Sequence, residues 1–164
     1  MVNFTKKILI NFTSFIPIFL LFFIALNGNS VVNIKMLPIN IHYILVYFWI
    51  LRKPESMRYS LIFLSGIITD VVYGLPLGIT ALSLLAIGGV AAYVRILTVR
   101  ITLINDWISF VPAIVLANFI YFLSLYFSNL SVDYLYLIKI SVVTFIAYPI
   151  LWVIFSIFIN FSKG

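Results

Sequence analysis

Charged residues are scarce in this sequence, and cysteine is absent. Only 9% of the 164 residues are charged, whereas 65% are hydrophobic. A typical soluble domain is about a quarter charged and about half apolar. Because so few polar side chains cannot cover a water-facing surface, the composition predicts that lipid surrounds this protein. Without cysteine there is neither a disulfide framework nor a thiolate metal site.

The groups that commonly perform catalysis are equally rare. His42 is the only histidine, which argues against a histidine-based metal site. Neither a Ser-His-Asp set, nor paired carboxylates, nor a glycine-rich phosphate loop is recognisable. The sequence therefore predicts a protein that is not an enzyme and has no cofactor. The net charge of +6 would suggest nucleic acid as the partner of a soluble chain. Here the charges lie singly in short loops, so we interpret them as topology determinants and expect no nucleic-acid partner.

Six apolar segments predict an all-α integral membrane protein, a six-helix bundle that forms one transmembrane domain over residues 1–164. The segments lie at 8–26, 38–51, 59–73, 77–94, 107–127 and 135–159. Each must be helical, because an unpaired backbone group in hydrocarbon costs several kcal/mol. We interpret the first segment as a retained helix rather than a signal peptide, since Ala25-Leu26-Asn27 is a poor cleavage site.

The second and third segments are short for membrane spans. About 14 residues extend roughly 21 Å in a helix, against a hydrocarbon core of about 30 Å. We expect either that longer neighbours shield these two segments or that the bilayer thins around them. The alternative is a chain with four crossings and two re-entrant segments.

The distribution of Lys and Arg predicts that both termini are cytoplasmic. The two basic residues on the outer side are then Lys35 and Lys139, and the remaining eight are cytoplasmic, a bias that sets orientation. Those eight are Lys6, Lys7, Arg52, Lys53, Arg58, Arg95, Arg100 and Lys163. Aromatic rings favour the membrane interface. Tyr47, Trp49, Tyr59 and Trp107 are predicted to lie at its cytoplasmic side, and Tyr73, Tyr126, Tyr134 and Tyr136 at its outer side.

The most informative segment runs from Ser65 to Leu82. Asp70 is predicted to be the only acidic residue inside the apolar spans, and the cost of its burial suggests that it faces protein. Small and polar residues at helical spacing around it form a stripe that permits close helix packing: Ser65, Gly66, Thr69 and Tyr73. Gly74, Pro76 and Gly78 predict a tight outer turn, because glycine allows positive φ and proline fixes φ.

Three interpretations of Asp70 remain open. It forms hydrogen bonds across helices or caps the turn before Pro76, or it is a proton or ligand site, or it contacts a partner protein directly. Lys139 is predicted to lie at a similar depth, so an intramembrane ion pair between Asp70 and Lys139 is a further hypothesis, with snorkelling of the lysine to the interface as its alternative.

Small and polar residues elsewhere predict further helix contacts. Gly88 and Ala92 are spaced for close packing, either within the chain or between chains. Asn118 and Thr144 are predicted to form hydrogen bonds between helices.

The pattern Gly66-x3-Asp70-x3-Gly74-x-Pro76-Leu77-Gly78-x2-Ala81-Leu82 resembles the signature of the MreD family, the rod shape-determining membrane proteins of bacteria. The spacing of Pro38, Tyr47 and Pro54, and the Tyr148-Pro149 pair, are also similar to that family. The resemblance implies that five signature residues serve partner binding or structure: Gly66, Asp70, Gly74, Pro76 and Gly78.

The same resemblance implies a function and partners. The function is that of a non-catalytic scaffold in the bacterial cytoplasmic membrane, which links the actin-like cytoskeleton to peptidoglycan synthesis in the elongation complex. The implied partners are membrane lipid, MreC on the periplasmic side, the MreB filament, the glycosyltransferase RodA and a transpeptidase.

Two other functions compete with this one. A substrate-binding membrane subunit of a vitamin-type transporter shares the six spans, but that class often docks through alanines four apart on its first helix. The bulky stretch from Phe15 to Ala25 lacks such a pattern, which favours the scaffold. A proton-coupled carrier would need more buried polar groups than Asp70 alone.

Overall fold

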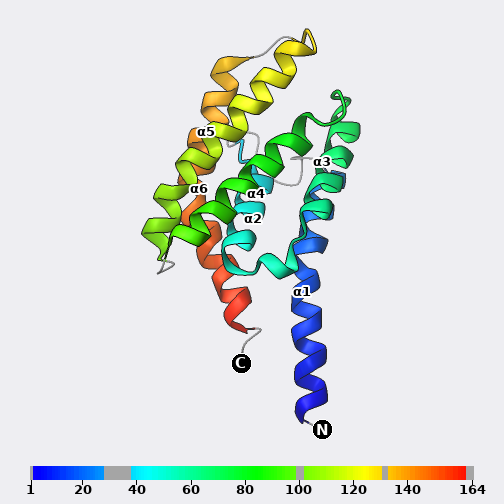
Figure 1. Ribbon diagram of the computed structural model, residues 1–164, viewed down its shortest axis with the longest axis vertical. Helices are drawn as coiled ribbons and strands as arrows, with labels where there is room; N and C mark the ends of the chain where they lie inside the picture. Colours follow the sequence, from blue (N-terminus) through cyan, green and yellow to red (C-terminus); the bar gives the residue numbers. More distant parts are fainter. Residues whose placement is uncertain (1, 28–37, 99–101, 131–132, 162–164) are drawn as a thin grey trace.

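The computed structural model describes residues 2–27, 38–98, 102–130 and 133–161, with side chains described between residues 15 and 160. All regular structure within these ranges is helical (Figure 1). The elements are α1 (Val2–Asn27), α2 (Ile41–Arg52), the 3-10 turn η2 (Pro54–Ser56), α3 (Tyr59–Tyr73), α4 (Ile79–Leu97), α5 (Leu103–Phe127) and α6 (Tyr134–Phe161). Successive helices run in alternating directions, so that α1 begins and α6 ends at the same end of the molecule.

Three helices are long and apolar enough to cross a membrane, and they make this chain a membrane protein. They are Ile79–Leu97, Leu103–Phe127 and Tyr134–Asn160. The other apolar helices whose side chains are described are shorter: Phe15–Asn27, Ile41–Arg52 and Tyr59–Tyr73. Helices occupy all six segments in which the sequence predicts them, and α3 has the predicted bounds.

Helix α2 lies at the centre of the bundle. Its residues from His42 to Leu51 are all buried, and it packs against α1, α4 and α6. Its 12 residues extend only about 18 Å, well short of a hydrocarbon core of about 30 Å. Neighbouring helices enclose α2, as predicted for the short segments, whereas α3 leaves Phe63, Leu64 and Val71 exposed and is only partly shielded.

The first turn of α2 begins inside the bundle and keeps its polar groups paired. The Asn40 side chain caps the helix by accepting a hydrogen bond from the Tyr43 backbone N–H at 3.3 Å. The Asn40 backbone N–H donates to Thr144 Oγ1 on α6 at 2.9 Å. Thr144 therefore contacts another element of the bundle, as predicted.

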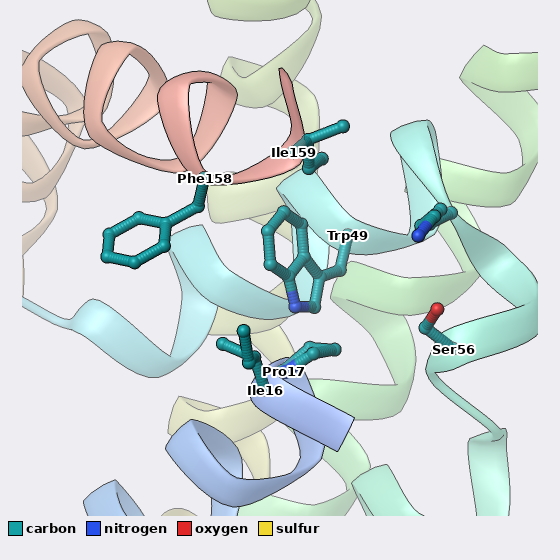
Figure 2. A pocket seen from close by; sticks show the side chains of 7 residues that line it. Ile16, Pro17, Trp49, Ser56, Phe158 and Ile159 are labelled. Atoms are coloured by element: carbon teal, nitrogen blue, oxygen red, sulfur yellow. The ribbon is translucent and has the colours of Figure 1, made fainter. Parts of the chain in front are cut away.

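The aromatic core corrects one prediction. Tyr47 and Trp49 are 0% and 3% exposed, so their rings pack in the protein core and do not face lipid headgroups. The ring centroid of Tyr47 lies 4.8 Å from that of Phe110 and 5.9 Å from that of Tyr148. Trp49 fills the space between α1 and the end of α6 (Figure 2). Both side chains are buried because α2 is covered on every side.

Candidate functional site

Asp70 joins α3 to the beginning of α4. Its side chain is 0% exposed, and its two carboxylate oxygens accept backbone hydrogen bonds, Oδ2 from Gly78 at 2.8 Å and Oδ1 from Thr80 at 2.9 Å. These N–H groups lie at the N-terminus of α4, where a helix has no acceptors of its own and favours a negative charge. Asp70 therefore caps α4 from the neighbouring helix, which supports its structural interpretation.

Gly66, one turn before Asp70, is where α3 and α4 approach each other closely. A Cβ atom at Gly66 would collide with the Cα of Ala81 and lie 2.7 Å from its backbone nitrogen. Ser65 and Thr69 are buried beside it, and each donates its hydroxyl hydrogen to a carbonyl of its own helix. Most of the predicted stripe of small and polar residues is thus buried against neighbouring helices.

The turn between α3 and α4 depends on two glycines. Gly74 has φ of +65° and ends α3, and Gly78 has φ of +104° and precedes α4. Side-chain-bearing residues rarely adopt such angles, so the backbone requires glycine at both positions. Pro76 and Leu77 are exposed between them. The five signature residues therefore all belong to one helical hairpin, α3–α4.

No family model, curated protein or solved structure matches this chain.

The predicted ion pair between Asp70 and Lys139 is not formed. Both Asp70 oxygens are occupied by backbone donors, and Lys139 is exposed on α6. Among the described side chains, the single ion pair joins Arg52 to Asp106. Equal depth in the bilayer did not place the two residues face to face, because α3 packs on α1 and α4 whereas α6 packs on α2 and α5.

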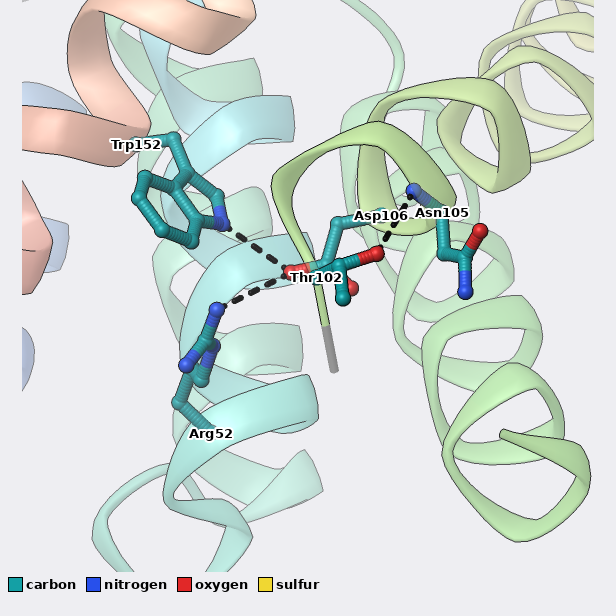
Figure 3. Close-up of polar contacts among 5 residues, drawn as sticks. All are labelled: Arg52, Thr102, Asn105, Asp106 and Trp152. Atoms are coloured by element: carbon teal, nitrogen blue, oxygen red, sulfur yellow. Dashed lines mark hydrogen bonds and ion pairs between the residues drawn. The ribbon is translucent and has the colours of Figure 1, made fainter. Parts of the chain in front are cut away.

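A second buried polar cluster ties α2, α5 and α6 together at the opposite end of the bundle. Asp106 is 1% exposed, and its Oδ2 accepts hydrogen bonds from Arg52 Nη2 at 3.3 Å and from Trp152 Nε1 at 3.0 Å (Figure 3). The guanidinium carbon of Arg52 also lies 4.9 Å from the centroid of the Trp152 ring. This cluster joins three helices through residues that are 46 and 54 positions apart in the sequence.

This cluster was not predicted from the sequence, because Asp106 was assigned to a loop and the fifth helix was predicted to start at residue 107. The helix begins at Leu103, and the Thr102 side chain caps it by accepting a hydrogen bond from the Asn105 N–H at 3.4 Å (Figure 3). A threonine directly before an apolar periodic segment is the signal that would have moved the predicted boundary. Asp70 is therefore not the only buried acid.

Two further predicted contacts are present. Gly88 is buried where α4 meets its neighbours within the chain, and a Cβ there would lie 3.0 Å from Ile50 Cδ1. Asn118 on α5 donates from Nδ2 to Ser141 Oγ on α6 at 2.6 Å. Both support the prediction of close or hydrogen-bonded helix contacts within the chain.

The contact at Gly66 predicts a clear difference between two glycines. Gly66→Ala is expected to lower the free energy of unfolding by about 2 kcal/mol, because the added methyl group overpacks the α3–α4 contact. Gly89→Ala is the matched control, since nothing lies within 4 Å of its Cβ position, and it is expected to be neutral or stabilising. Thermal unfolding in detergent micelles measures both. Equal melting temperatures would contradict the close approach at Gly66.

Proposed function

We propose that this chain is a non-catalytic membrane scaffold subunit of the bacterial cell-elongation complex, linking the actin-like cytoskeleton to peptidoglycan synthesis. The observation that carries the proposal is that all five signature residues, which resemble those of the MreD family, build the α3–α4 hairpin. Each carboxylate oxygen of Asp70 accepts a backbone hydrogen bond, which fits a structural role for this side chain. The hairpin is therefore suited to holding a shape rather than to turning over a substrate.

In this proposal the turn of the hairpin is the docking surface for a periplasmic partner of the MreC type. Leu77 is 68% exposed and is held between two residues of restricted geometry, Pro76 and Gly78. A preformed apolar contact loses little conformational entropy on binding. An MreB-like filament, a RodA-like glycosyltransferase and a transpeptidase belong to the same proposed complex.

The proposal includes six crossings of the bacterial cytoplasmic membrane, with both termini in the cytoplasm. It is supported by the position of the beginning of α1 and the end of α6 at the same end of the molecule (Figure 1). Arg52, Lys53, Arg58 and Arg95 lie at helix ends that face this side, which matches a positive cytoplasmic face. The side chains of Lys6, Lys7, Lys35, Arg100 and Lys163 lie outside the described residues.

Single-cysteine variants test both the orientation and the partner, because the chain contains no cysteine. A membrane-impermeant maleimide added to intact spheroplasts is expected to label Leu77→Cys in the α3–α4 turn. It is expected to spare Glu55→Cys, which is exposed at the other end of α3. Labelling of Glu55→Cys alone, or of both variants equally, would contradict the proposed topology.

The same Leu77→Cys variant carries a benzophenone crosslinker for the partner experiment. Co-expressed with a coiled-coil periplasmic protein of the MreC type, it is expected to give several-fold more crosslinked product than Leu130→Cys. Leu130 is the matched control because it is exposed beyond the end of α5. Equal yields from the two variants would remove the hairpin turn as the docking surface.

A substrate-binding subunit of a vitamin-type transporter is the second candidate, and one observation favours it. A cavity of about 610 Å³ opens at the end of the bundle that carries the α3–α4 turn. If the purified protein retains a vitamin tightly and recovers no wall-synthesis partner, the scaffold proposal is wrong.

A further inference from the structure

The cavity at the α3–α4 end is built by most of the bundle. Its walls come from α2, α3, α5 and α6, together with the end of α1 and the start of α4. Its volume of about 610 Å³ falls within the range of about 300–1,000 Å³ that is usual for small-molecule sites. Pockets between the helices of a bundle are common ligand positions.

The lining of the cavity carries no charge. None of the described side chains that line it is Asp, Glu, Lys or Arg. The nearby carboxylate of Asp70 is held by two backbone N–H groups and is not part of the wall. Since a charged ligand would lose its hydration without gaining a counter-ion, the cavity selects against ions.

Two of the residues that line the cavity, on different helices, carry hydrogen-bond acceptors that their existing contacts identify. His42 Nε2 lies 3.0 Å from the carbonyl oxygen of Leu21, so Nε2 carries the hydrogen and Nδ1 of the neutral ring is an acceptor. Asn118 donates from Nδ2 to Ser141 Oγ, which leaves its carbonyl oxygen as an acceptor. A matching ligand therefore offers N–H or O–H groups.

Tyrosine rings form another part of the wall. Tyr43, Tyr121 and Tyr136 line the cavity beside aliphatic side chains. Flat rings pack well against tyrosine, by offset stacking or edge contacts.

We propose that this cavity binds an uncharged, ring-containing small molecule that donates hydrogen bonds. The class follows from the neutral lining, the acceptors on His42 and Asn118, and the tyrosine rings. The proposal goes beyond the scaffold function and does not depend on it.

The test compares two probes of the same shape and different charge on the full chain in lipid nanodiscs. Indole-3-carboxamide is neutral and has N–H donors, whereas indole-3-carboxylate is an anion. Saturation-transfer NMR at millimolar concentration is expected to show binding of the carboxamide, and affinity for the carboxylate at least about tenfold weaker. No binding of the carboxamide, or equal binding of the two probes, would overturn the proposal.

Substitutions in the cavity wall test whether the carboxamide binds in this cavity. Asn118→Leu removes the acceptor and is expected to weaken carboxamide binding about tenfold. Ile140→Trp, which keeps the contact between Asn118 and Ser141, fills the cavity and is expected to abolish binding even if Asn118→Leu fails to fold. Asn105→Leu is the control, because Asn105 is exposed on α5 away from the cavity. Retained binding in the folded Ile140→Trp variant would overturn the proposal.

Native mass spectrometry of the same nanodiscs tests whether a phospholipid occupies the cavity instead. A phospholipid that stays bound in stoichiometric amount and is not displaced by the carboxamide would overturn the small-molecule assignment. Loss of partner crosslinking at Leu77→Cys with carboxamide binding intact would instead count against the scaffold function alone.

Discussion

Replacing Asp70 by alanine is expected to lower the free energy of unfolding by about 3 kcal/mol. The substitution leaves the backbone N–H groups of Gly78 and Thr80 without their acceptors, and each unpaired buried donor costs about 1–3 kcal/mol. It also removes a negative charge from the N-terminus of α4, where the helix dipole favours one by about 0.3–1 kcal/mol. Reversible unfolding in mixed detergent micelles measures the loss.

Asp133 provides the matched control for this experiment. Its Oδ1 accepts a hydrogen bond from the Tyr136 N–H at 3.1 Å at the start of α6, but its side chain is exposed. Asp133→Ala is expected to cost less than about 1 kcal/mol, since water replaces an exposed cap. If Asp70→Ala proved as stable as the unmodified protein and only its function in cells were lost, Asp70 would be a proton or ligand site instead.

Replacing Asp106 by alanine is the second large effect, expected at about 2 kcal/mol. Removing one partner of a buried ion pair typically costs about 3–5 kcal/mol. The Arg52 side chain is 25% exposed, so solvent screening and movement of the guanidinium toward the interface reduce that cost. Trp152 also loses its acceptor.

A second substitution separates the ion pair from simple packing. In Asp106→Ala with Arg52→Met, the unpaired cation is gone, so we expect the double variant to recover part of the lost stability. Asn105→Ala, one residue away and exposed, is expected to stay within about 0.5 kcal/mol of the unmodified protein. Additive losses at Arg52 and Asp106 would show that the two side chains are not coupled.

The sequence predicted the residue ranges of the helices better than it predicted which helix faces are buried in protein. The bilayer forces apolar segments to be helical, and the turn at Gly74 and Gly78 could be predicted because few other residues adopt positive φ. The orientation of α2 could not, because lipid and protein core are both apolar and select the same side chains. Tyr47 and Trp49 were therefore assigned to the interface although they lie in the core.

The sequence predicted which residues belong to the candidate site, but it did not predict the hydrogen-bond partners of Asp70. The burial cost of Asp70 correctly indicated that it faces protein, yet span topology gives only depth along the bilayer normal. It does not give the position of each helix around the bundle, so Lys139 was chosen as a partner in place of two backbone amides. Asp106 was missed because a boundary error of four residues removed it from the fifth helix.

The cap that Asp70 places on α4 has a consequence for biogenesis. If α3 entered hydrocarbon alone, its carboxylate would lack the partners that compensate for the transfer, because Gly78 and Thr80 belong to the start of the next helix. Helix α3 has only 15 residues, fewer than the roughly 20 that a membrane span needs, so it would be a poor transmembrane segment on its own. In the proposed topology we therefore expect the two helices to enter the bilayer as a pair, with α4 supplying the amides that hydrogen-bond the carboxylate of α3.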